Sequence, residues 1–123
     1  MVTLRTVIKL EKMKSQEILI MKQESDWKRF RSLIPMVRER YLAEQNAMLL
    51  KILTDPNRSE TERFWDAFNR GKEVREILTD CLDGHSKSKM VFYIRLMLRA
   101  TMMCQDDLVS FSDELQTHLK TEF

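Results

Sequence analysis

The feature that most constrains the fold of this 123-residue chain is its scarcity of glycine and proline, with only two of each. Hairpins and tight turns depend on these residues, so the chain has little means of building a sheet. Nine methionines, together with abundant Leu, Glu, Lys and Arg, favour helix instead. The sequence therefore predicts an all-α protein.

Helix signals predict a compact bundle of three long helices plus one or two short C-terminal helices. Ser25 is a plausible N-cap for the first long helix, with Asp26 in its first turn. Pro35 either begins a new helix or kinks the one in progress, because it lacks a backbone donor. The pair Asp55-Pro56 is expected to end this first helical region.

The second helix is predicted from Ser59-x-x-Glu62, which matches a capping box. The third is predicted from "MVFYIRLMLRATMMC", which is apolar nearly all round and so suits the buried centre of a bundle. Ser112 is expected to cap a short C-terminal helix. The apolar stripe expected to face the core on the second helix comprises Phe64, Ala67, Phe68, Gly71, Val74, Leu78, Cys81 and Leu82.

Length and pattern predict one helical domain at residues 21–123, preceded by an N-terminal extension at residues 1–20. A chain of 123 residues can bury roughly two-thirds of its unfolded surface, enough for a core without disulfides or metals. We expect residues 1–20 to be mobile or loosely ordered, because their apolar pattern is the least regular in the chain.

Charge is distributed unevenly along the chain. Residues 1–58 carry 12 Lys/Arg and 7 Asp/Glu, a net charge of +5, whereas residues 59–123 carry 9 and 12, a net charge of −3. The two halves could attract each other within one fold or between subunits. Neither half concentrates the positive charge of a strong nucleic-acid binder.

The sequence favours a cytoplasmic protein. Two cysteines are too few for a disulfide framework, and no apolar run reaches the roughly 18–20 residues of a membrane span. The N-terminus lacks the apolar core of a secretory signal. Residues 1–14 are basic with a single acid, Glu11, and share only their composition with an organelle transit peptide.

The stretch "DCLDGHSKSKM" at residues 80–90 joins two predicted helices and holds one Cys, one His and one Gly. We interpret it as a structural joint, because Cys81 continues an apolar stripe and Gly84 stands where a left-handed residue often ends a helix. The alternative is a metal site of Cys81 and His85, completed by Asp83 or by Cys104 and His118. Their spacing matches no tight zinc module, so we predict no metal and no cofactor.

A third interpretation of this stretch is anion binding. The candidate residues lie at the start of a predicted helix, where free amides and a partial positive charge attract phosphate or carboxylate. The fragment lacks the spacing of a nucleotide-binding loop. The anion-binding candidates are His85, Ser86, Lys87, Ser88 and Lys89.

Arg95 and Arg99 are the two charges on the most apolar predicted helix, and their spacing of four places them on one face. They either form a narrow exposed strip, pair with acids such as Asp66, Glu73 or Asp80, or face a partner. Arginine suits ion pairs at interfaces, so both are candidate partner-binding residues.

The basic run "WKRFRSLIPMVRER" at residues 27–40 allows a nucleic-acid interpretation, because aromatic and basic residues alternate in it. Its aromatics, however, are spaced like core residues, which favours a packed face with solvated charges around it. Because the same run could still meet a partner, Trp27, Arg31 and Arg38 are candidate partner-binding residues.

These observations predict a small non-enzymatic helical protein, an adaptor or regulator that acts by binding another protein and associates with itself as a homodimer. No arrangement of acid, base and nucleophile is evident, so no catalytic residue is predicted. The first alternative is a nucleic-acid-binding regulator that uses the basic Lys28–Arg40 surface. The second is a binder of a small anion near Lys87–Lys89.

Overall fold

A computed structural model describes the backbone of residues 4–120 and the side chains of residues 23–120. This part of the chain forms four α-helices and two short 3-10 helices, with no strand. The predicted all-α, compact helical fold is confirmed. The elements are α1 (Leu4–Leu53), α2 (Glu60–Leu82), η1 (Lys87–Lys89), α3 (Met90–Arg99), η2 (Gln105–Leu108) and α4 (Asp113–Lys120).

α1 is a single helix of 50 residues that runs through Pro35. Pro35 is exposed, so water can bind the Arg31 carbonyl that loses its partner amide. The predicted helix start at Ser25 is wrong, because this residue lies inside α1. The predicted division at residue 20 stays a prediction, because the side chains of residues 1–22 lie outside the described set.

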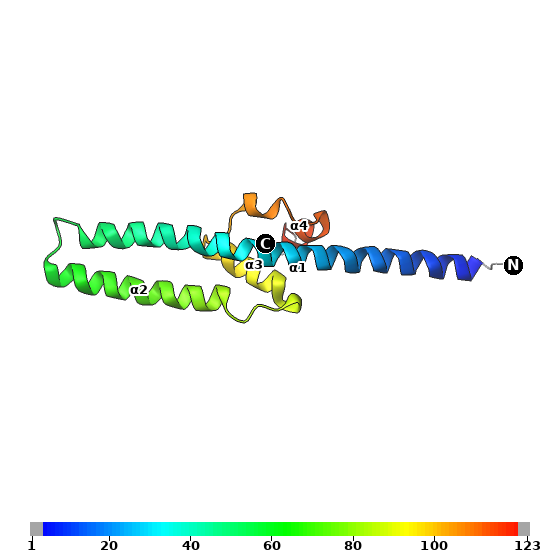
Figure 1. Cartoon of the computed structure of the whole chain (residues 1–123), viewed down its shortest axis with the longest axis horizontal. Coiled ribbons are helices and arrows are strands. Elements are labelled where there is room, and N and C mark those ends of the chain that lie inside the picture. The colour runs from blue at the N-terminus through cyan, green and yellow to red at the C-terminus, as the bar shows by residue number, and fades with distance from the viewer. Residues whose placement is uncertain (1–3, 121–123) are drawn as a thin grey trace.

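α1 and α2 form a long antiparallel hairpin, and α3, η2 and α4 lie against its inner half, near the middle of α1 (Figure 1). The connection at residues 54–59 ends α1 just before Asp55-Pro56, as predicted. The predicted capping box is also confirmed: the Glu62 amide donates to Ser59 Oγ at 3.1 Å. The outer half of the hairpin therefore consists of two helices only.

The core lies at the inner half, where α1 meets α3, η2 and α4. Phe30, Ile34, Val37 and Tyr41 follow one another at three- and four-residue steps along α1, which places them on one face. From the C-terminal half of the chain, the buried side chains that pack with them include Ile94, Met97, Met102, Met103, Leu108, Phe111, Leu115 and Leu119.

α3 is shorter than the sequence predicted, because the chain turns after Arg99. Thr101 adopts a left-handed conformation with φ of 54°. The Met102 and Met103 amides then donate back to the Met97 carbonyl at 2.9 and 3.1 Å. This arrangement closes the helix end, although the position is one that glycine usually occupies.

Polar side chains of α1 hold the C-terminal segment in place. Arg40 donates from Nη1 and Nη2 to Asp107 at 3.0 and 2.6 Å, and from Nη2 to the Met102 carbonyl at 3.0 Å. Arg29 Nε donates to Ser110 Oγ at 2.7 Å. The hydrogen bonds from Arg40 lower the pKa of Asp107, although burial acts in the opposite direction.

Candidate protein-binding surface

The joint between α2 and α3 contributes contacts to the fold. Gly84 has φ of 76°, the left-handed conformation predicted for it. His85 Nε2 lies 2.7 Å from the Cys81 carbonyl and donates to it. The His85 ring also contacts the rings of Phe30 and Tyr93, at centroid distances of 5.0 and 4.7 Å. His85 thus closes the end of α2 and packs on the core.

The other predicted anion-binding residues are only partly brought together. Lys87 forms an ion pair with Glu24 of α1, which already balances its charge. The hydroxyls of Ser86 and Ser88 lie 3.4 Å apart, and Lys89 is exposed at the end of η1. With His85 turned away and η1 only three residues long, we do not place a function here.

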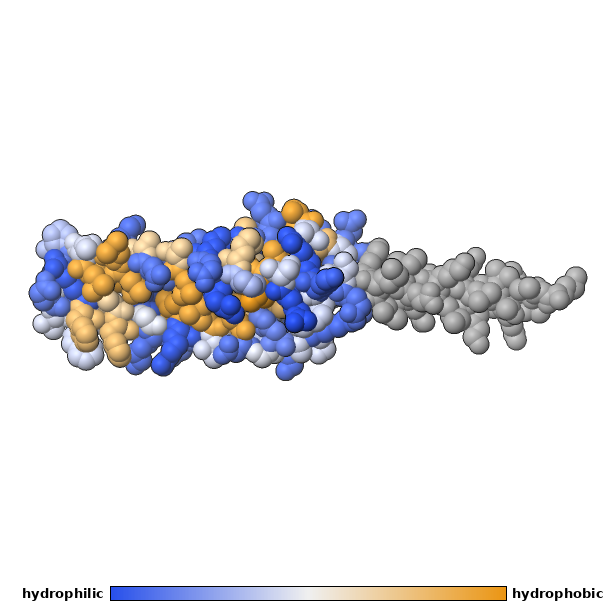
Figure 2. Space-filling model, viewed as in Figure 1, coloured by the Kyte–Doolittle hydropathy of each residue, from blue (hydrophilic) through white to orange (hydrophobic). Residues whose placement is uncertain are grey.

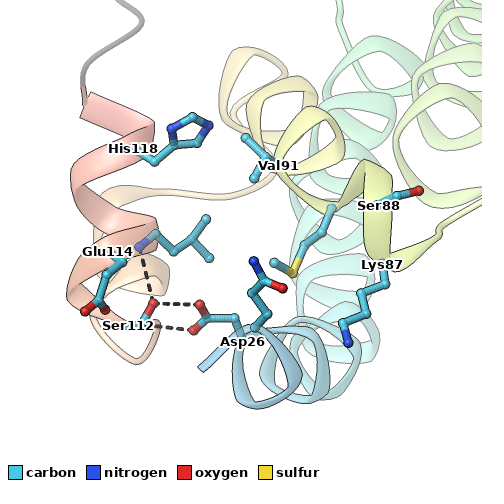
Figure 3. Close-up of a pocket in the computed structure, with 10 residues that line it drawn as sticks. Asp26, Lys87, Ser88, Val91, Ser112, Glu114 and His118 are labelled. Atoms are coloured by element: carbon cyan, nitrogen blue, oxygen red, sulfur yellow. Dashed lines mark hydrogen bonds between the residues drawn. The ribbon is translucent and has the colours of Figure 1, made fainter. Parts of the chain in front are cut away.

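A hollow of about 770 Å³ lies between α1, η1, the start of α3 and α4 (Figure 3). Within it, Ser112 donates from its amide and its hydroxyl to the Asp26 carboxylate, at 2.8 and 2.6 Å. Ser112 Oγ also accepts the Leu115 amide at 3.2 Å, so Ser112 caps α4 as predicted. These groups fasten α4 to α1, which gives Asp26 a role that the sequence did not reveal.

The predicted nucleic-acid surface at Lys28–Arg40 is divided in two by the fold. Arg29 and Arg40 bind the C-terminal segment, as described above. Trp27 is half-buried and stacks on the core, whereas the Arg31 guanidinium lies over its ring at 5.9 Å. The exposed positive surface is therefore smaller than the sequence suggested.

Arg95 and Arg99 occupy different environments despite their helical spacing. Arg95 is half-buried, and its Nη2 donates to the His118 carbonyl at the end of α4, at 3.4 Å. This contact suits the partial negative charge of a helix C-terminus. Arg99 is exposed as the last residue of α3. One expected partner, Asp66, pairs with Arg58 at 3.1 Å.

The outer half of the hairpin carries an exposed aromatic cluster, which we define as Phe64, Trp65 and Phe68 of α2. These side chains are 58%, 53% and 50% exposed. The two Phe rings are stacked with centroids 6.2 Å apart, and Trp65 meets both edge-on. Orange surface gathers over this end of the hairpin in Figure 2. Nearby on α1, Met48, Leu50 and Leu53 are also exposed.

A separate shallow groove of about 170 Å³ lies further inward between α1 and α2. Arg38 and Leu42 line it from α1, and Leu78 and Leu82 line it from α2. Arg38, a predicted partner-binding residue, thus lies at the edge of a partly apolar groove.

The sequence pattern failed to separate two apolar stripes on α2. Val74 and Cys81 are buried, whereas Phe64 and Phe68 are exposed, so the expectation that all four face the core is wrong. The signal that separates them is the spacing of four and three residues that links Phe64 and Phe68 to Gly71 and the exposed Arg75.

The candidate metal ligands are dispersed. Cys81 is buried, Cys104 is exposed, and His85 is turned towards the end of α2. Among residues 23–120, no three His, Cys, Asp or Glu side chains form a group that could hold a metal ion. In the same part of the chain, no helix has both the length and the apolarity needed to cross a bilayer.

Comparison with known protein families, with curated proteins and with solved structures found no match to this chain.

Proposed function

We propose that this protein acts by binding another protein, as an adaptor or regulator in the cytoplasm, rather than by catalysis. The observation that carries the proposal is the aromatic cluster on the outer half of the hairpin. Monomeric proteins rarely leave stacked aromatic rings together in solvent, and such patches mark interaction sites. Large aromatic side chains also dominate the binding energy of protein interfaces.

The arrangement of the fold supports the same proposal. Among the described residues, nine large hydrophobic side chains are exposed, and six of them lie on the outer half of the hairpin. The core lies elsewhere, at the inner half, so these side chains are not needed to hold the fold together. The hairpin thus extends an apolar surface beyond the part of the molecule that stabilises it.

The proposal is tested with the double variant Phe64→Ser, Phe68→Ser. We expect this variant to remain folded, because both side chains are half-exposed, and to lose proteins that the wild-type chain retains from a native extract. The matched control is Phe92→Ser, Val109→Ser, which removes two exposed apolar side chains outside the hairpin. Retention of the same proteins, including further copies of the chain, by all three forms would overturn the proposal.

A further inference from the structure

We propose that the occupant of this surface is a second copy of the chain, whose α2 pairs antiparallel with the first α2. This inference rests on the proposed function and names the partner. It rests on a second stripe on α2, formed by Phe64, Phe68, Gly71 and Arg75, which we call the outer stripe.

The outer stripe has the spacing of a helix–helix seam. Its members alternate steps of four and three residues, which is the a/d pattern of a coiled coil. The stripe that faces α1, represented by Val74 and Cys81, lies about 100° around the helix, since successive residues are offset by that angle. α2 can therefore pack on α1 and on a second helix at once, as each helix of a four-helix bundle does.

The two ends of the outer stripe differ in chemistry and complement each other. Its first half is aromatic, with Phe64 and Phe68 on the stripe and Trp65 beside it. Its second half is small and cationic, with Gly71 and Arg75 on the stripe and Lys72 beside it. Within one chain, Lys72 Nζ already lies 5.7 Å from the centre of the Phe68 ring. A cation over an aromatic face is attracted to it.

Antiparallel pairing brings each aromatic residue opposite a residue that suits it. With the two-fold axis between Phe68 and Gly71, the Phe68 ring of one copy meets Gly71 of the other. Phe64 then meets Arg75, and Trp65 meets Lys72. A two-fold interface of this kind uses the same patch on both copies. Parallel pairing would instead set Arg75 against Arg75 on the seam, where like charges repel.

Gly71 supports this register, because nothing within its own chain requires a glycine. A Cβ built at this position meets no atom within 4 Å, and its φ is not in the left-handed region. Glycine within a helix nevertheless costs about 1 kcal/mol relative to alanine. In the proposed dimer, the absence of a side chain at Gly71 leaves room for the Phe68 ring of the second copy.

The first test is the dissociation constant of the dimer, measured by sedimentation equilibrium for wild type and for Gly71→Leu. Leucine favours helix over glycine, and a Cβ at this position meets no atom of the chain within 4 Å, so the variant is expected to fold at least as well. The leucine side chain occupies the space opposite Phe68 in both copies of the dimer. We therefore expect the dissociation constant to rise at least about tenfold. The control is Asn69→Leu, which adds the same side chain at an exposed position outside the outer stripe.

The second test reverses charge with Lys72→Glu, Arg75→Glu, which replaces attraction to the facing aromatics by repulsion. We expect at least a tenfold rise in the dissociation constant, about 1.4 kcal/mol. The control Lys89→Glu, Arg99→Glu makes the same change in net charge at exposed positions elsewhere.

Spin labels at Thr61, an exposed residue three positions before Phe64 on the same stripe, report the orientation of the pair. In the antiparallel register, the two labelled positions are offset along the axis by roughly 25 Å, from the rise per residue of an α-helix. In a parallel pair they would lie side by side across the seam.

Three outcomes would overturn the inference. A wild-type chain that stays monomeric would do so while leaving the proposed function intact, provided that the aromatic cluster still retains another protein. A dimer that Gly71→Leu and the charge reversal weaken no more than their controls would place the interface on another face. Spin labels at Thr61 in near contact would exclude the antiparallel arrangement.

Discussion

Replacement of Arg40 by methionine is expected to destabilise the protein, because the Asp107 carboxylate then loses the cation that pairs with it. Methionine keeps most of the apolar stem of arginine but removes the guanidinium. Three hydrogen bonds disappear with it, two to Asp107 and one to the Met102 carbonyl. The Asp107 side chain, only 7% exposed, then keeps its amide and thiol donors from Cys104 but has no cation beside it.

The magnitude follows from the burial of the two partners. Breaking a fully buried ion pair by removing one partner costs about 3–5 kcal/mol. The Arg40 side chain is 38% exposed, so water can reach the vacated site and replace part of what is lost. We therefore expect the free energy of unfolding to fall by about 2 kcal/mol at neutral pH. For a chain of this length that corresponds to a fall in Tm of roughly 10 °C.

The effect should depend on pH in a defined direction. The pKa of Asp107 in the folded state is lowered, chiefly by the hydrogen bonds from Arg40. A lowered pKa stabilises the fold fully above the unfolded-state value of about 3.9, and this contribution is lost as pH falls through the folded-state value. The difference in the free energy of unfolding between wild type and Arg40→Met should therefore be largest at neutral pH and should become smaller below about pH 4.

The measurement is urea unfolding followed by far-UV circular dichroism at several pH values, with the midpoints compared at equal slope. Arg38→Met is the control, because it makes the same change at an exposed position on the same helix. Its effect should stay within about 0.5 kcal/mol. If both variants lose the same stability, or if the Arg40→Met difference is independent of pH, the reasoning about Asp107 is wrong.

Further predictions concern local features of the fold. Ser59→Ala should lower the free energy of unfolding by about 1 kcal/mol, because the Glu62 amide loses its capping partner, and the urea midpoint measures this loss. Thr101→Gly should raise it by about 1 kcal/mol, because Thr101 is β-branched and held at positive φ; a lower midpoint would contradict this. Native alkylation with mass spectrometry should label exposed Cys104 and spare Cys81, whose thiol is buried and has a pKa raised by that burial. Equal labelling of both thiols would show that the core opens readily.

The sequence predicted best the features that depend on a few adjacent residues. The capping box at Ser59 and the stop at Asp55-Pro56 are decided within one helical turn, and both were confirmed. Gly84 was likewise predicted from its place after an apolar stripe, and its φ of 76° agrees. In each case the physical cause, an orphan amide or a backbone conformation, lies in the residues themselves.

Features that depend on distant residues were predicted poorly. Asp26 looked like a first-turn acid, but it is buried against Ser112, which follows it by 86 positions. Pro35 looked like a boundary, yet the buried Ile34 and Val37 on either side hold the helix in place. No local pattern could show that these partners exist.

The aromatic cluster was missed for a third reason. Phe64 and Phe68 lie at spacings that also fit a core stripe, and periodicity alone cannot tell a face that packs within the chain from one that packs outside it. The difference arises because α3 and α4 lie against the inner half of the hairpin and leave its outer half uncovered (Figure 1).

The ties between α1 and the C-terminal segment also set an order of folding during synthesis. Asp26, Arg29 and Arg40 bind residues that follow them by 86, 81 and 67 positions. The α1–α2 hairpin, by contrast, closes through the short connection at residues 54–59 and can form while later residues are still inside the ribosome. Until α4 arrives, the core face of α1 around Phe30 and Val37 lacks its cover. The nascent chain thus exposes apolar surface at both halves of the hairpin, and the docking of α4 leaves only the outer one.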